Sequence, residues 1–245
     1  MMPMIQIPDS DLTAYRAEPH GEPKGAVIVI HEIWGLVDHI RSVADRYAAE
    51  GYLAVAPDIL SDAGVSPSVG QELHNLAKNQ DEATRMTAQP LMREKLTATR
   101  EPAYGAWAIS QLRRVVDYLE TQPGVDGRIA VTGFCFGGSY AFALAAADPR
   151  VKAAAPFYGA PPEESDIASI ACPIHAFYGG LDERLMDSLP AVSTAMADAG
   201  VDFEATVYEG ARHAFFNDTN DLTYDAEAAS DSWTQVLEFL EAELA

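Results

Sequence analysis

Short apolar segments alternate with longer amphipathic segments along most of the chain. Residues 26–30, 128–131 and 173–178 are short, apolar and rich in β-branched or aromatic side chains, and residues 203–208 alternate in polarity, as strands do. Two further stretches, around Ile5 and at 12–15, predict edge strands. These segments predict a sheet whose strands are separated by helical crossovers.

Helical segments fall between and after these strands. Residues 140–147 are rich in helix formers, and residues 225–243 place Trp233 and Leu240 on one apolar stripe. Strands that alternate with helices are typical of an α/β fold, with a mostly parallel central sheet and helices on both faces. A chain of 245 residues with no linker or repeat predicts a single domain over residues 1–245.

The longest interruption of this alternation runs from about residue 61 to residue 99. It contains polar helical stretches and Pro90, and residues 72–85 have the composition of a helix. We expect it to be an excursion over the sheet edge that carries the candidate site described next.

Cys135 lies between a strand and a helix, with Gly133 and Gly137 two positions away on either side. A turn this sharp strains its central residue and leaves no room for flanking Cβ atoms, which is how a nucleophile is presented at a strand-to-helix elbow. A phosphate-binding loop is disfavoured because Ser139 stands where that motif requires lysine. An ordinary buried cysteine remains the alternative.

A thiol nucleophile requires a base and a group that orients the base. Asp182 follows the strand at 173–178, and His213 follows the strand at 203–208. Loops after parallel strands open at the same edge of a sheet, so the three residues can converge there. Asp182 could instead cap a helix, and Glu183 beside it could serve as the acid.

Among the other histidines, His31 is the strongest rival to His213, because it closes the strand at 26–30 and precedes Glu32. A zinc-binding helix would need a second histidine four positions later, where Gly35 stands, so no metal site is expected. His175 falls inside a strand and is expected to be a satisfied interior group.

Four segments, 31–36, 133–138, 179–182 and 212–216, resemble in the same order those of the dienelactone hydrolase family of α/β-hydrolases. The resemblance covers nearly the whole chain. It implies an α/β-hydrolase fold and a cofactor-independent hydrolase of small esters or lactones, with Cys135, His213 and Asp182 as its triad. It also implies that Glu32 holds the thiol in a protected form until substrate arrives.

Attack on a carbonyl places negative charge on its oxygen, which backbone N–H groups must stabilise. In this fold the donors are the residue after the nucleophile and one in the loop after the third strand, here Phe136 and Ile33. Losing one such donor costs about 3 to 4 kcal/mol of transition-state stabilisation.

The family resemblance also bears on substrate binding. One of the family's two carboxylate-binding arginines corresponds to Arg93, but the other corresponds to Asn217, whose neutral amide cannot replace a guanidinium. Trp34, Phe134 and Phe216 lie in or beside the candidate catalytic segments and suggest an apolar substrate pocket. Core packing is the alternative for each of these aromatic residues.

The chain carries 37 acidic and 16 basic residues, for a net charge of −21, which argues against nucleic-acid binding. The acidity is consistent with a high-salt habitat, in which case thermal stability should rise between low and molar salt. The amino-terminal residues lack the pattern of a signal peptide or a membrane span, so a cytoplasmic enzyme is expected. No pattern predicts the oligomeric state.

Two other functions fit the same residues. The site could cleave a thioester, an amide or an activated phosphoester, which a substrate panel would distinguish. The chain could also be a catalytically idle binding protein, because a fold does not fix a function.

Overall fold

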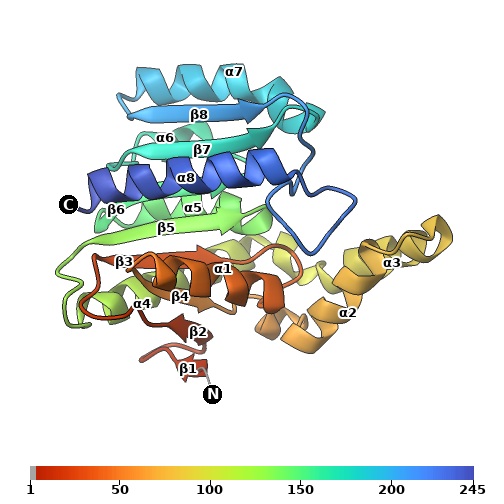
Figure 1. Cartoon of the computed structure of the whole chain (residues 1–245), viewed down its shortest axis with the longest axis horizontal. Coiled ribbons are helices and arrows are strands. Elements are labelled where there is room, and N and C mark those ends of the chain that lie inside the picture. The colour runs from red at the N-terminus through yellow and green to blue at the C-terminus, as the bar shows by residue number, and fades with distance from the viewer. Residues whose placement is uncertain (1–3) are drawn as a thin grey trace.

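The computed structural model describes residues 4–245, which form an eight-stranded sheet (Figure 1). The strands, in sheet order, are β1 (Met4–Gln6), β2 (Thr13–Ala17), β4 (Leu53–Pro57), β3 (Ala26–Ile30), β5 (Ile129–Phe134), β6 (Val151–Phe157), β7 (Ile174–Gly179) and β8 (Phe203–Tyr208). β2 pairs antiparallel with both β1 and β4, and β4, β3, β5, β6, β7 and β8 run parallel to one another. The mostly parallel sheet and the two amino-terminal strands are confirmed, but only β1 is an edge strand, because β2 lies between β1 and β4.

Helices cover both faces of the sheet. In Figure 1, α1 (Asp38–Ala49) and α8 (Ala226–Glu243) lie in front of the strands, and α4 (Pro102–Glu120) and α5 (Phe136–Ala147) lie behind them. The chain steps from β3 to β4 in one direction and from β5 to β6 in the other, so right-handed crossovers place α1 and α5 on opposite faces. The short α6 (Glu164–Ile167) and α7 (Glu183–Asp198) complete the helices that accompany the sheet.

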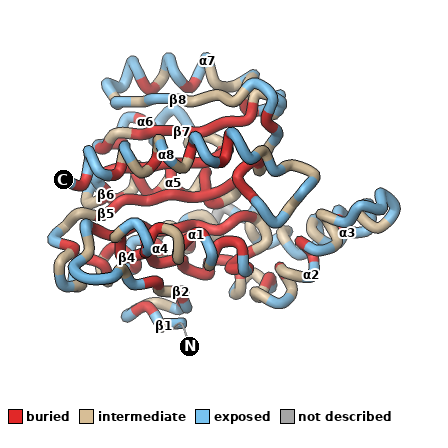
Figure 2. The backbone as a smooth tube through the Cα atoms, viewed as in Figure 1, coloured by how far each residue is buried: buried red, intermediate tan, exposed pale blue. Residues whose placement is uncertain are grey.

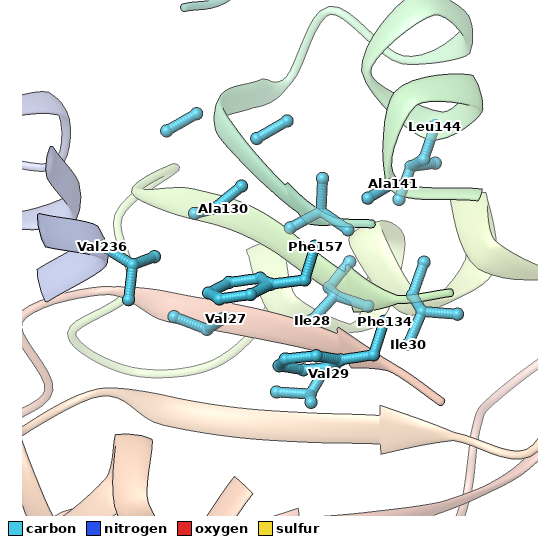
Figure 3. Close-up of a cluster of buried hydrophobic side chains, with 14 of the residues drawn as sticks. Val27, Ile28, Val29, Ile30, Ala130, Phe134, Ala141, Leu144, Phe157 and Val236 are labelled. Carbon is cyan, nitrogen blue, oxygen red and sulfur yellow. The ribbon is translucent and has the colours of Figure 1, made fainter. Parts of the chain in front are cut away.

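The core follows the central strands, and every residue of β3, β4 and β5 is buried (Figure 2). Val236 of α8 and Ala141 and Leu144 of α5 join the strand side chains in one cluster (Figure 3). Strands buried on both faces have continuous apolar sequences, which is why these segments do not alternate in polarity.

β3 and β5 are neighbours in the sheet, and the crossovers that follow them, through α1 and α5, lie on opposite faces. Crevices form at the carboxyl ends of strands at such a switch point and commonly bind ligands. The loops that follow β3 and β5 therefore begin at the place where a site is expected.

The excursion contains two helices, α2 (Pro67–Ala77) and α3 (Glu82–Lys95), and the short 3₁₀ turns Ser61–Ala63 and Ala98–Arg100. Both helices extend past the carboxyl ends of the strands (Figure 1). The prediction of one helix over 72–85 is wrong, because the Asp81 side chain accepts a hydrogen bond from the Thr84 backbone N at 2.9 Å and starts a new helix. None of the helices described over residues 4–245 has the length and apolar character needed to cross a bilayer.

Candidate active site

Cys135 occupies a strained turn between β5 and α5. Its backbone has φ 56° and ψ −112°, a conformation that L-residues rarely adopt. A Cβ on Gly133 would lie 2.0 Å from the Gly137 carbonyl oxygen, and one on Gly137 would lie 2.2 Å from the Ile30 carbonyl oxygen. Both glycines are therefore required by close backbone approach, as the sequence suggested.

The loops after β7 and β8 bring Asp182 and His213 together. His213 Nδ1 and Asp182 Oδ2 are 2.5 Å apart, and the Asp182 side chain is only 11 % exposed. Two backbone bonds hold the loops side by side, from Leu181 N to the Ala211 oxygen and from Gly180 N to the Tyr208 oxygen. Asp182, not Glu183, is thus the carboxylate that contacts the histidine.

The Cys135 thiol faces Glu32 and two backbone N–H groups. Burial, followed by the charge of Glu32, raises the pKa of Cys135 to about 12, while the N–H groups of Phe136 and Ile33 act in the opposite direction. The two expected oxyanion donors therefore both lie beside the thiol. No hydrogen bond joins Sγ to His213 within residues 4–245.

Glu32 is a buried carboxyl group with a neutral partner. Its Oε2 accepts a hydrogen bond from Asn217 Nδ2 at 2.7 Å, and none of the described lysine or arginine side chains pairs with it. Burial raises the pKa of Glu32, and the nearby His39, Asn217, His213 and Tyr158 act to lower it. Asn217, which the resemblance pairs with a family arginine, thus contacts Glu32 in this chain.

His31 and His175 have structural partners. His31 Nδ1 lies 2.7 Å from the Glu32 carbonyl oxygen, and its Nε2 accepts from Ile59 N at 3.2 Å. Because both ring nitrogens are occupied, His31 cannot act as the base. His175 bonds Thr206 Oγ1 at 2.9 Å through Nε2, which confirms it as a satisfied interior group.

Tyr158 was not found by the sequence reasoning. It follows β6 directly, has φ 40°, and packs its ring 5.1 Å from the His213 ring. Its hydroxyl is buried and has no hydrogen-bond partner among the described residues, and burial, followed by the charges of Glu32 and Cys135, raises the pKa of the phenol. In the sequence, only the position of Tyr158 directly after a strand could have indicated that it lies at the site.

A cavity of about 610 Å³ lies next to the loop that follows β3. Ile33 and Trp34 line it from this loop, and Arg93 lines it from α3, together with Arg85 and Arg100. The remaining lining is mainly apolar and includes Met86, Met92 and Leu96. The structure thus brings two of the predicted substrate-binding residues, Trp34 and Arg93, to one cavity.

Phe134 and Phe216 were expected to line the substrate pocket, and that expectation is wrong. Both are buried to 1 % exposure or less, and their rings stack 5.3 Å apart. Phe157 packs against both, and the Arg46 guanidinium lies 4.9 Å from the Phe216 ring centroid. These aromatic rings form core beneath the site, which was the alternative left open by the sequence.

Two further side chains at the site also escaped the sequence reasoning. The charge of Arg184, at the start of α7, acts to lower the pKa of the Cys135 thiol. His74 of α2 is buried against Trp34, with ring centroids 5.2 Å apart. Arg184 lies two positions after Asp182, a spacing that could have indicated it, whereas nothing in the sequence pairs His74 with Trp34.

Known proteins are similar to this chain over nearly its whole length. The sequence profile of the Dienelactone hydrolase family matches residues 12–244. A protein from Saccharolobus solfataricus named "Putative carboxymethylenebutenolidase" is 34 % identical, over 95 % of each chain. A protein of the same name from Synechocystis sp. is 31 % identical, over 98 % of this chain and 96 % of its own.

A solved structure agrees as well. A crystal structure of a "Putative Dienelactone Hydrolase" from Klebsiella pneumoniae superposes with a TM-score of 0.81 at 28 % identity, covering 97 % of each chain. The expected α/β-hydrolase fold is thereby confirmed. The chain therefore belongs to the dienelactone hydrolase family and is a carboxymethylenebutenolidase-like hydrolase.

Proposed function

We propose that this chain hydrolyses small esters or lactones with Cys135, His213 and Asp182 as a catalytic triad. The observation that carries the proposal is the 2.5 Å contact between His213 and Asp182 at the sheet edge where the strained Cys135 elbow opens. A histidine held by a carboxylate through Nδ1 leaves Nε2 to exchange protons with a nucleophile or a water molecule.

The reaction proceeds in two steps. The Cys135 sulfur attacks the carbonyl carbon as the C–O bond breaks, and the imidazolium of His213, which holds the thiol proton, returns it to the leaving oxygen. Water then loses a proton to His213 and attacks the acyl-thiol carbon, which releases the acid and the sulfur. The N–H groups of Phe136 and Ile33 stabilise the negative oxygen in both steps.

Glu32 restrains the thiol before substrate binds. Its charge opposes formation of the thiolate, and the resting sulfur has no hydrogen bond to His213 among the described residues. The thiol must therefore leave the Glu32 side of the site before His213 can take its proton.

The 610 Å³ cavity is the substrate-binding site in this proposal, and residues 61–99 form one wall of it. Arg93 and Arg100 have no side-chain partner within residues 4–245, although the chain carries 37 acidic residues. Two unpaired guanidinium groups beside Trp34 and Met92 favour a substrate with an apolar body and an anionic group. Arg93→Gln should raise KM for an anionic ester and leave KM for a neutral ester of similar size unchanged.

Steady-state kinetics test the proposal. Cys135→Ala should abolish hydrolysis of an activated phenyl ester, and Cys172→Ala, which removes the other cysteine, should leave it intact. Full activity in Cys135→Ala would refute the assignment. A panel of thioesters, amides and activated phosphoesters at one pH identifies the preferred bond, and ligand binding without turnover of any of them would indicate an idle binding protein.

A further inference from the structure

Asn217 is oriented so that it can only donate to Glu32. Its Oδ1 accepts hydrogen bonds from the backbone N and the Oγ1 of Thr219, at 3.1 and 2.7 Å. Two donors to the oxygen fix the orientation of the amide, so Nδ2 must be the atom 2.7 Å from Glu32 Oε2. A group that donates but carries no charge stabilises an ionised carboxylate without neutralising its field.

Tyr158 approaches the same carboxyl group from the end of β6. Its hydroxyl has no partner at hydrogen-bond distance, yet it is close enough to Glu32 to favour the charged carboxylate. A buried hydroxyl without a close partner and a bulky residue at φ 40° are both costly. Tyr158 combines both features and lies beside the Cys135 thiol, which indicates that it serves the site rather than core packing.

The other charged and titratable groups that face Glu32 come from different elements. His39 of α1, His213 of the loop after β8 and Cys135 of the elbow complete its surroundings. None of them is a permanent cation. The charge of His39, whose Nδ1 lies 3.3 Å from Asp218 Oδ1, is the strongest of the influences that lower the pKa of Glu32, and the neutral groups of Asn217 and Tyr158 act in the same direction.

We propose that Asn217 and Tyr158 are positioning residues that keep Glu32 ionised beside Cys135 and thereby set the pH at which the resting thiol becomes reactive. This inference rests on the proposed roles of Cys135 and Glu32. Removal of the Asn217 amide or of the Tyr158 hydroxyl shifts Glu32 toward its neutral acid, which no longer opposes the thiolate. The thiol of the resting enzyme then becomes more reactive near neutral pH.

Alkylation by iodoacetamide tests this without requiring turnover, because the reagent attacks only the thiolate. The rate at Cys135, followed by residue-resolved mass spectrometry at pH 7, should rise at least tenfold in Glu32→Gln and at least threefold in Asn217→Ala and Tyr158→Phe. The matched controls are Asn220→Ala, in the same loop, and Tyr178→Phe, a buried tyrosine of β7; both should alkylate at the wild-type rate.

Faster alkylation could come from an effect on Glu32 or from a general loss of packing in the site, and double variants distinguish the two explanations. Adding Asn217→Ala or Tyr158→Phe to Glu32→Gln should give no further increase, because the carboxylate on which they act is gone. Unchanged or slower alkylation in both single variants, or additive increases in the double variants, would overturn the inference. Failure of the proposed triad appears separately, as ester hydrolysis that survives in Cys135→Ala.

Discussion

Asp182→Asn isolates the contribution of the carboxylate that contacts His213. The substitution keeps the size of the side chain and removes its charge. In the wild-type structure Oδ2 lies 2.5 Å from His213 Nδ1, and the Asp182 side chain is 11 % exposed. With charge centres about 4 Å apart and an effective dielectric constant of about 20, the carboxylate stabilises an imidazolium by about 4 kcal/mol. Since the imidazolium forms only as the reaction proceeds, that energy corresponds to a loss of about 10³-fold in kcat/KM.

The assay is hydrolysis of an activated phenyl ester at pH 7, and Glu183→Gln is the matched control. Glu183 is adjacent in sequence and loses the same charge, but it lies in the first turn of α7 and has no contact with His213. Its kcat/KM should stay within threefold of wild type. A loss of less than tenfold in Asp182→Asn, or an equal loss in Glu183→Gln, would refute the reasoning.

Three other variants test separate parts of the structure. Arg184→Gln removes a charge that lowers the pKa of Cys135, so thiol alkylation at fixed pH should slow about threefold, and an unchanged rate would contradict this. Burial raises the pKa of Asp148, but hydrogen bonds from Arg150 outweigh burial and hold that pKa below its ordinary value. The ionised Asp148 carboxylate therefore stabilises the folded protein at pH values above its unfolded-state pKa, and this contribution is lost as the pH falls through its folded-state pKa. Asp148→Asn should therefore lower the free energy of unfolding in urea by about 2 kcal/mol at pH 7, and a deficit undiminished at pH 3 would argue against the linkage. Phe216→Ala should lower the free energy of unfolding by about 3 to 5 kcal/mol and leave KM within twofold of the wild-type value. A large rise in KM without destabilisation would instead indicate that Phe216 contacts the substrate.

The parts of the site that the sequence predicted correctly depend on local chain geometry. Gly133 and Gly137 are needed because the elbow brings backbone atoms within van der Waals distance, and that requirement is visible in the sequence. Asp182 and His213 follow strands of recognisable composition, and the parallel sheet brings the ends of those strands to one edge.

The predictions that failed depend on tertiary packing. Phe134 and Phe216 are close to catalytic segments in sequence, but the direction of each ring is decided by Phe157 on a neighbouring strand. Sequence proximity therefore could not distinguish pocket from core. The break between α2 and α3 was detectable in principle, because Asp81 followed by Thr84 is a helix-capping pattern.

The surroundings of Glu32 lay beyond sequence reasoning for a different reason. Asn217 was identified as a departure from the family, but its bond to Glu32 joins residues 185 positions apart. Tyr158 has an unremarkable sequence context, and its significance comes from a positive φ and an unpaired hydroxyl. Such features exist only once the fold has formed.

Intact-mass analysis after rapid mixing with an activated ester or lactone tests the central claim most directly. The triad proposed here predicts a transient mass increase equal to the acyl group, located on Cys135 by peptide mapping and absent from Cys135→Ala. His213→Ala should slow both the appearance and the loss of the adduct. Turnover with no acyl mass on Cys135 at any time, or an adduct mapped to another residue, would contradict the account.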